Sequence, residues 1–215
     1  MSKDQIDQLK NPFTMDLNRR QFVTSSLAAG IILPTALAAA GNASAGAHKA
    51  GGKFRLGMGH GSTTDSLDPG TSENGMSQNV IFAYCNHLTE VSKKGQLIPE
   101  LASEYGASAD AKVWTFKIRS GVTFHDGKAL TPADVVASFQ FHMGEDTKSA
   151  GKALLADVTN IAINGDDVVF TLSNGSADFA FIVSDYHFPI LPVRDGQLDW
   201  ASGIGTGGYI MENYE

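Results

Sequence analysis

Two glycine-rich segments of this 215-residue sequence raise the question of phosphate binding, and neither has the required spacing. Residues 57–61 read Gly-Met-Gly-His-Gly after an expected strand, but no helix starts directly behind them. No acidic residue follows at a strand end about twenty positions later, as a dinucleotide site needs. Gly121 to Lys128 has five residues between its glycines and Ala129 where a phosphate loop needs Ser or Thr. Both patterns argue against a nucleotide site.

The side chains that could act as nucleophiles, acid–base groups or metal ligands are scattered. The histidines at 48, 60, 87, 125, 142 and 187 form no H-x-H or H-x-x-x-H pair, so only a metal site assembled from distant histidines stays open. No G-x-S-x-G elbow is present, and Cys85 in an apolar helical pattern fits a buried core position better than a nucleophile. Asp166 and Asp167 are neighbours in an expected hairpin turn and point apart. We therefore predict no catalytic residues, no cofactor and no metal.

Composition narrows the possible partners. The chain has 16 Lys and Arg against 23 Asp and Glu, a net charge of −7, which argues against nucleic-acid binding because phosphate contacts need a basic face. One cysteine cannot form an internal disulfide. The length allows one or two domains with a real apolar core.

The first 45 residues have the order of a signal peptide. Arg19 and Arg20 precede a weakly apolar stretch, Leu27 to Ala40, which is too short and too rich in alanine to span a membrane. Ala43-Ser44-Ala45 then offers a small-residue cleavage site. The paired arginines resemble the twin-arginine export signal, which predicts a periplasmic protein cleaved near Ala45, with residues 46–52 as a linker. An N-terminal membrane anchor or a buried helix is the alternative.

The mature part predicts a mixture of strands and helices. The following segments carry strand patterns: 53–58, 113–118, 122–124 with 129–130, 158–163 with 168–172, and a last strand within 203–211. Helical spacing is found over 78–91, 131–143 and 177–184, and residues 97–102 form a short apolar element.

The start of the 131–143 helix is the sharpest local signal. Thr131 can cap the helix, Pro132 suits its first position, and Asp134 can bond back to the Thr131 amide. The pattern faces Val135 and Phe139 inward, so we expect them to share one core with Phe116 and Ile118 of the 113–118 strand.

Several segments together resemble the family 5 extracellular solute-binding proteins of ABC transporters, the dipeptide/oligopeptide-binding type. The densest match runs from Trp114 through His125-Asp126-Gly127-Lys128 to Phe139. The Ser66-Leu67-Asp68-Pro69 turn, the Leu97–Ala102 segment and the Gly205–Tyr209 block add to it. Two positions depart from the pattern: Ala111 stands where Gly is usual and Gly208 where Pro is usual.

This resemblance implies a fold and a function. The fold would be α/β, a mixed α+β sheet of the periplasmic-binding-protein-like type II, with residues 53–215 forming the N-terminal lobe only. The full-length protein would be a monomer that captures a peptide or other small solute between lobes and delivers it to ABC permease subunits. The ligand-facing candidates would be Glu73, Asn74 and Gly75 after the Leu-Asp-Pro turn, and Asp185, Tyr186 and His187.

Alternatives stay open at this point. The six candidate positions are equally consistent with ordinary solvated loops. The solute could be a peptide, nickel, haem, glutathione or a sugar. A second function, an exported enzyme of unknown reaction that uses the twin-arginine route, also remains.

Overall fold

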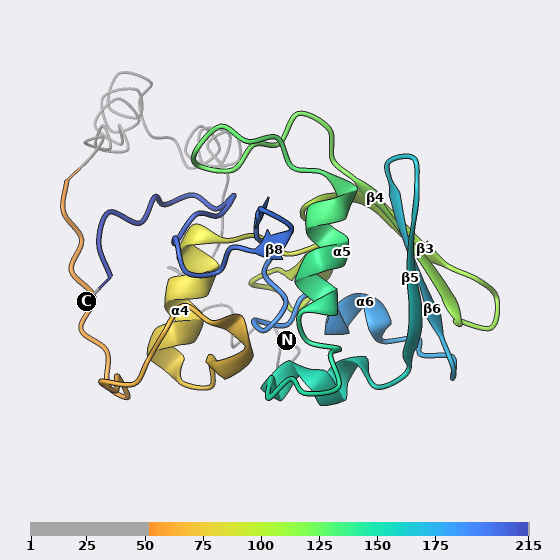
Figure 1. The fold of residues 1–215 in the computed structure, drawn as a ribbon, viewed down its shortest axis with the longest axis horizontal. Coiled ribbons are helices and arrows are strands. Elements are labelled where there is room, and N and C mark those ends of the chain that lie inside the picture. The colour runs from red at the N-terminus through yellow and green to blue at the C-terminus, as the bar shows by residue number, and fades with distance from the viewer. Residues whose placement is uncertain (1–51, 215) are drawn as a thin grey trace, which may run out of the picture. The chain divides into compact units, whose positions relative to one another are not determined.

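The computed structural model describes residues 52–214, coloured in Figure 1. The predicted signal peptide and all of the linker except Gly52 lie outside the described residues. Residues 52–56 belong to a first unit of the chain, and every helix and strand described here belongs to a second unit that starts at Gly57. The α-helices are α4 (Gly75–Tyr84), α5 (Pro132–Gln140) and α6 (Phe179–Ile182), and the short 3-10 helices are η1 (Pro69–Thr71) and η2 (Ala150–Leu155). The strands are β1 (Thr89–Val91), β2 (Leu97–Pro99), β3 (Ala102–Ala107), β4 (Val113–Ile118), β5 (Val158–Asn164), β6 (Asp167–Leu172), β7 (Val193–Arg194) and β8 (Gln197–Leu198).

A four-stranded antiparallel sheet in the order β3-β4-β6-β5 is the main element of the fold. Trp114 pairs with Phe170 and Phe116 with Val168, so alternate residues of β4 and β6 share one face. That face is buried, while the intervening residues are more exposed. The predicted strands 113–118 and 158–163 with 168–172 are confirmed, and Gly165 takes the positive φ of +63° that their hairpin turn requires.

The core lies between this sheet and the helices α5 and α6. Phe139 of α5 meets Phe170 edge to face at 4.9 Å between ring centroids, and Phe179 of α6 lies 5.2 Å from the same ring. Figure 1 shows both helices on one side of the sheet. The four residues predicted to share a core, Phe116, Ile118, Val135 and Phe139, all belong to this cluster.

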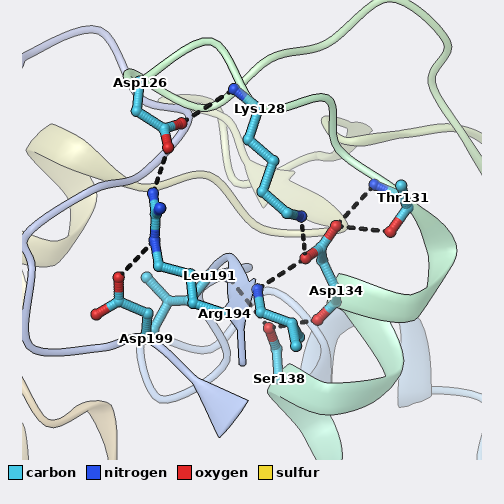
Figure 2. Close-up of polar contacts among 9 residues, drawn as sticks. Asp126, Lys128, Thr131, Asp134, Ser138, Leu191, Arg194 and Asp199 are labelled. Atoms are coloured by element: carbon cyan, nitrogen blue, oxygen red, sulfur yellow. Dashed lines mark hydrogen bonds and ion pairs between the residues drawn. The ribbon is translucent and has the colours of Figure 1, made fainter. Parts of the chain in front are cut away.

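The capping role predicted for Asp134 at the start of α5 is confirmed. Asp134 accepts hydrogen bonds from the Thr131 amide and hydroxyl at 2.9 and 2.7 Å (Figure 2). Its other oxygen accepts from Lys128 Nζ and from the Val193 amide. Burial alone would raise the pKa of Asp134, but these donors hold it below its usual value. One buried carboxylate thus joins the start of α5 to the 122–130 hairpin and to β7.

A second link in Figure 2 runs through Arg194 at the end of β7. Its guanidinium pairs with Asp126 in the hairpin turn and, through Nε at 2.8 Å, with Asp199. The turn of this hairpin is confirmed, since Gly127 turns the chain with φ +88°. The expected strands 122–124 and 129–130 are reduced to a single bridge between Thr123 and Ala129.

The expected strand at residues 53–58 is not formed. These residues have no regular secondary structure, and Phe54 and Leu56 are 88% and 62% exposed. A strand needs a hydrogen-bonded neighbour, and no strand among residues 52–214 pairs with this segment, so the alternating pattern alone was insufficient.

The expected helix over 78–91 is wrong at both ends. α4 starts at Gly75 because Asn74 caps it, and it stops at Tyr84, since Cys85 adopts an extended backbone. Leu88 and Val91 continue the helical spacing, yet Leu88 O accepts from the amides of Glu100 and Ala102. Residues 89–91 form β1, which pairs with β2, and residues 97–102 divide between β2 and the start of β3.

The last expected elements also differ. The 177–184 helix is reduced to α6, and no strand forms within 203–211. Instead, Gly207 and Tyr209 donate to the carbonyls of Tyr84 and Ala83, so this segment follows the C-terminal end of α4. Gly207 has no room for a side chain there, because a Cβ would lie 2.6 Å from the Tyr84 carbonyl carbon.

Candidate functional site

A pocket of about 530 Å3 lies where the end of α4, the β1–β2 hairpin and the segment after α6 meet. The elements are tied together around it: Thr89 Oγ1 of β1 donates to the Ala180 carbonyl of α6 at 2.7 Å, and the Ile190 amide donates to Asn86 O. The lining consists of Phe82, Cys85, His87, Thr89, Glu90, Val91, Glu100, Phe181, Ser184, Asp185 and Tyr186. This volume is within the range of small-molecule sites.

Glu100 occupies one side of the pocket and is held rigidly. One carboxylate oxygen accepts from Asn86 Nδ2, and the other accepts from the His87 amide at 2.6 Å. Burial raises the pKa of Glu100, although these donors oppose the shift. Among residues 52–214, the Arg119 guanidinium bonds to the backbone carbonyl of Glu100 and not to its carboxylate, so it does not neutralise that carboxylate directly.

Asp185 and His187 form a second polar pair. Asp185 Oδ1 accepts from the His187 amide at 3.0 Å and lies 2.7 Å from His187 Nδ1. Burial alone would raise the pKa of Asp185, but these bonds lower it, so the carboxylate is kept charged. His187 itself is buried and is absent from the pocket lining, so its role in this geometry is to orient Asp185.

His87 is the most unusual group of the pocket. It is 2% exposed, its ring lies 5.2 Å from that of Phe82, and its Nε2 has no hydrogen-bond partner among the described residues. Burial lowers its pKa to about 4, although nearby Asp185 opposes the shift. The imidazole is therefore neutral near pH 7 and keeps one unused ring nitrogen.

The first predicted group lies at the start of α4. Asn74 caps the helix, with Oδ1 accepting from the Met76 and Ser77 amides, and its Nδ2 donates to Asp65 Oδ1 at 2.8 Å. Gly75 is the first helical residue, and Glu73 is exposed just before the cap. The Asn74 amide is thus committed to the backbone and to Asp65.

The structure brings the two predicted groups near one another through Tyr186. Its hydroxyl group lies beside the side chain of Gln78 of α4. Burial, with the nearby carboxylates of Asp185 and Glu73, raises the pKa of Tyr186. Asp185 and Tyr186 line the pocket, whereas Glu73, Asn74, Gly75 and His187 do not.

Within residues 52–214, no group of three or more His, Cys, Asp or Glu side chains is arranged to hold a metal ion. In the same part of the chain, no helix is both long enough and apolar enough to cross a membrane. Cys85 is a free, buried thiol whose pKa burial raises beyond its usual range, which confirms the prediction of a core cysteine.

The family model of the bacterial extracellular solute-binding proteins, family 5 middle region, matches residues 96–215, more than half of the chain. The chain belongs to this family. The family 5 resemblance found in the sequence is therefore confirmed, and none of the similarities favours an exported enzyme.

Curated relatives agree with the family 5 assignment. The chain is 29% identical over 159 residues to a probable peptide ABC transporter periplasmic-binding protein, y4tO, of Sinorhizobium fredii, covering 74% of this chain and 28% of that protein. It is 32% identical over 170 residues to the periplasmic murein peptide-binding protein MppA of Escherichia coli, covering 68% and 32%. The chain thus spans about a third or less of the length of these relatives.

Solved structures show the same fold. The periplasmic binding protein AgaA of Agrobacterium tumefaciens, solved with agropinic acid, superposes with a TM-score of 0.64 at 26% identity, over 70% of this chain and 31% of that one. The open, unliganded form of MppA gives 0.63 at 21% identity. The mixed α/β fold of the type II periplasmic binding proteins is confirmed for the described residues.

Most residues of the pocket were not predicted from the sequence. Asp185 and Tyr186 were predicted, but Phe82, His87, Glu90 and Glu100 were not, because they were assigned to one continuous helix or to a short apolar segment. Glu100 lies within the Leu97–Ala102 family segment, and this motif is the one sequence signal that points to it.

Proposed function

We propose that this chain is part of the extracytoplasmic solute-binding component of an ABC importer. It captures a peptide or another small solute and presents it to permease subunits in the inner membrane. The observation that carries this proposal is the family 5 match over residues 96–215, together with relatives named for peptide binding. The pocket beside α4 and β1 supplies a concave, partly polar surface of suitable size.

In this proposal the chain supplies one wall of a two-sided site. Asp185 and Tyr186 face the solute, Glu73 contributes negative charge beside Tyr186, and Asn74 with Gly75 fixes the loop that carries Glu73. His187 orients Asp185. Because the relatives are about three times longer, a second wall is expected from sequence that this chain does not contain, and closure between the walls supplies the affinity.

The test is a chimera in which residues 53–215 replace the corresponding part of Escherichia coli MppA. We expect the chimera to bind di- or tripeptides with a micromolar Kd by calorimetry, whereas the 215-residue chain alone binds them no tighter than millimolar, because one open wall leaves the ligand hydrated. A chimera that unfolds cooperatively but binds no peptide would contradict peptide capture. Micromolar binding by the chain alone would contradict the two-walled site.

We further propose export through the twin-arginine route to the periplasm, with cleavage near Ala45. Residues 1–45 fused to a reporter should deliver it to the periplasm, and replacement of both Arg19 and Arg20 by Lys should stop delivery, since Lys lacks the guanidinium group. Replacement of Lys3 and Lys10 by Arg is the matched control and should leave delivery unchanged. Periplasmic reporter in the Arg19/Arg20 variant would contradict the twin-arginine route.

A further inference from the structure

The pocket beside α4 holds negative charge that its own lining does not neutralise. Glu90, Glu100 and Asp185 line it, and neither Lys nor Arg does. Glu100 already accepts two hydrogen bonds, and Asp185 uses Oδ1 for His187. The Glu90 side chain is exposed, and its carboxylate makes no hydrogen bond or ion pair with any residue that the structure describes. The lining therefore has capacity to accept hydrogen bonds from a cation.

Aromatic rings accompany these carboxylates. Phe82 is 53% exposed and Phe181 46% exposed, although both are large apolar side chains that normally avoid water. With Tyr186 they give the pocket three aromatic side chains. Aromatic faces attract cations as well as apolar groups, so rings beside carboxylates suit a positive charge carried on an apolar stem.

His87 provides an independent indication that a polar ligand belongs here. It is almost fully buried, lines the pocket, and keeps Nε2 without a partner. A buried ring nitrogen left without a hydrogen bond costs free energy, and nearly all such groups in folded proteins have a partner. A donor group of a bound solute would complete it.

We propose that this pocket binds the alkylammonium or alkylguanidinium group of a solute, as found on free amines and on lysine or arginine side chains. This rests on the proposed solute-binding function and specifies the ligand chemistry for it. A pocket of about 530 Å3 has room for a four-carbon stem and its charged head. The carboxylates Glu90 and Asp185 contact the charged head, and Phe82, Phe181 and Tyr186 contact the stem.

The experiment is an NMR titration of the 15N-labelled 215-residue chain with butylguanidinium chloride at constant ionic strength. We expect saturable shifts confined to amides around the end of α4, β1 and the segment after α6. N-butylurea, which has the same shape and no charge, should bind about ten-fold more weakly because it lacks the charge-assisted contacts.

Variants test whether the pocket carboxylates contribute to binding, independently of any effect on folding. The double variant Glu90→Gln/Asp185→Asn should weaken butylguanidinium binding about ten-fold. Glu90→Gln alone, which removes no bond within the chain, should weaken it about three-fold and keeps the test valid if the double variant unfolds. Asp178→Asn, an exposed carboxylate next to α6 and outside the pocket, is the control and should have no effect. Equal binding of butylurea, or full affinity in Glu90→Gln, would overturn the proposal.

A peptide titration distinguishes a basic side chain from a free amine as the source of the cation. It also separates this inference from the proposed peptide-binding function. The MppA chimera is titrated with Ala-Arg-Ala and with Ala-norleucine-Ala. Preference for the arginine peptide that disappears in Glu90→Gln supports a basic side chain as the ligand, whereas butylguanidinium binding without that preference supports a free amine. Peptide binding with no effect of charge in either titration would overturn this inference and leave the proposed function standing. If the chain bound butylguanidinium but the chimera bound no peptide, this inference would stand and the proposed peptide capture would be contradicted.

Discussion

The core beneath the sheet and the wall of the pocket differ in the polarity of the side chains that they bury. Under the sheet the largest buried groups are apolar, and the ring of Phe116 and that of Phe139 both contact the ring of Phe170. Around the pocket the buried or half-buried groups include His87, Glu100 and Asp185, which carry polar atoms into a partly desolvated space.

In our proposal, this difference separates residues that stabilise the fold from residues that contact a ligand. Burial of the phenylalanine rings stabilises the native state without any polar cost. Burial of His87 with an unpaired Nε2 lowers the stability of the native state. Stability measurements on variants of either region test this comparison.

Acid should destabilise the chain through its buried histidines. Burial lowers the pKa of both His87 and His142 from 6.5 to about 4; for His142 nearby His187 adds to the shift. Between these values the unfolded chain binds protons that the folded chain excludes, so stability falls as pH falls from 6.5 toward 4. We expect each group to contribute a loss of about 2–3 kcal/mol by the bottom of this range, measured by urea unfolding at a series of pH values.

Variants identify the groups responsible. His142→Gln should remove roughly half of the pH dependence between pH 6.5 and 4.5, since one of the two titrating histidines is lost. His60→Asn, which changes an exposed histidine, should leave the dependence unchanged. A free energy of unfolding that stays constant across this range would show that the two histidines titrate alike in the folded and unfolded chain.

Two adjacent glycines should respond very differently to a methyl group. At Gly207 a Cβ would meet the Tyr84 carbonyl carbon at 2.6 Å and the Cys85 amide nitrogen at 2.8 Å, whereas at Gly208 nothing lies within 4 Å. Gly207→Ala should therefore destabilise the contact between residues 205–209 and α4 by about 2 kcal/mol, and Gly208→Ala by much less. Hydrogen exchange at the Gly207 and Tyr209 amides measures this, and equal exchange in both variants would contradict the packing.

Local signals explain which parts of the fold the sequence could predict. The hairpins at 122–130 and 158–172 and the start of α5 depend on residues close in sequence, such as Asp134 bonding three positions back to Thr131. Chain segments that depend on distant partners were mispredicted. Residues 86–91 leave the helix because their backbone groups bond to residues 97–102 and to Ile190, which no helical pattern contains.

The same reason limits prediction of the site. Asp185 and Tyr186 were named from their place in the family pattern. His87, Glu90 and Glu100 become pocket residues only because α4 stops at Tyr84 and the chain turns back as β1 and β2. Their spacing in the sequence carries no sign of this, since the pairing that assembles them is not periodic.

The smallest predicted effect is a stabilisation on the sheet side, at the turn between β3 and β4. Ala111 has φ +53° and sits in the left-handed region that glycine adopts without cost. The turn enforces this conformation, because the Ala111 amide donates to Ser108 O at 2.8 Å and its carbonyl accepts from the Ser176 amide at 3.1 Å. An alanine in this region costs about 1–2 kcal/mol, which exceeds the roughly 0.5–1 kcal/mol of extra unfolded-state entropy that glycine brings.

Ala111→Gly should therefore raise the free energy of unfolding by about 0.5–1 kcal/mol, a rise of about 2–3 °C in Tm for a chain of this size. Ala109→Gly is the matched control, since Ala109 lies in the same turn, is exposed, and does not have a positive φ. It gains no relief of strain and should be neutral or slightly destabilising. If Ala111→Gly lowered Tm as much as Ala109→Gly did, the left-handed conformation at Ala111 would be absent in solution, and the usual family glycine at this position would need a cause other than backbone strain.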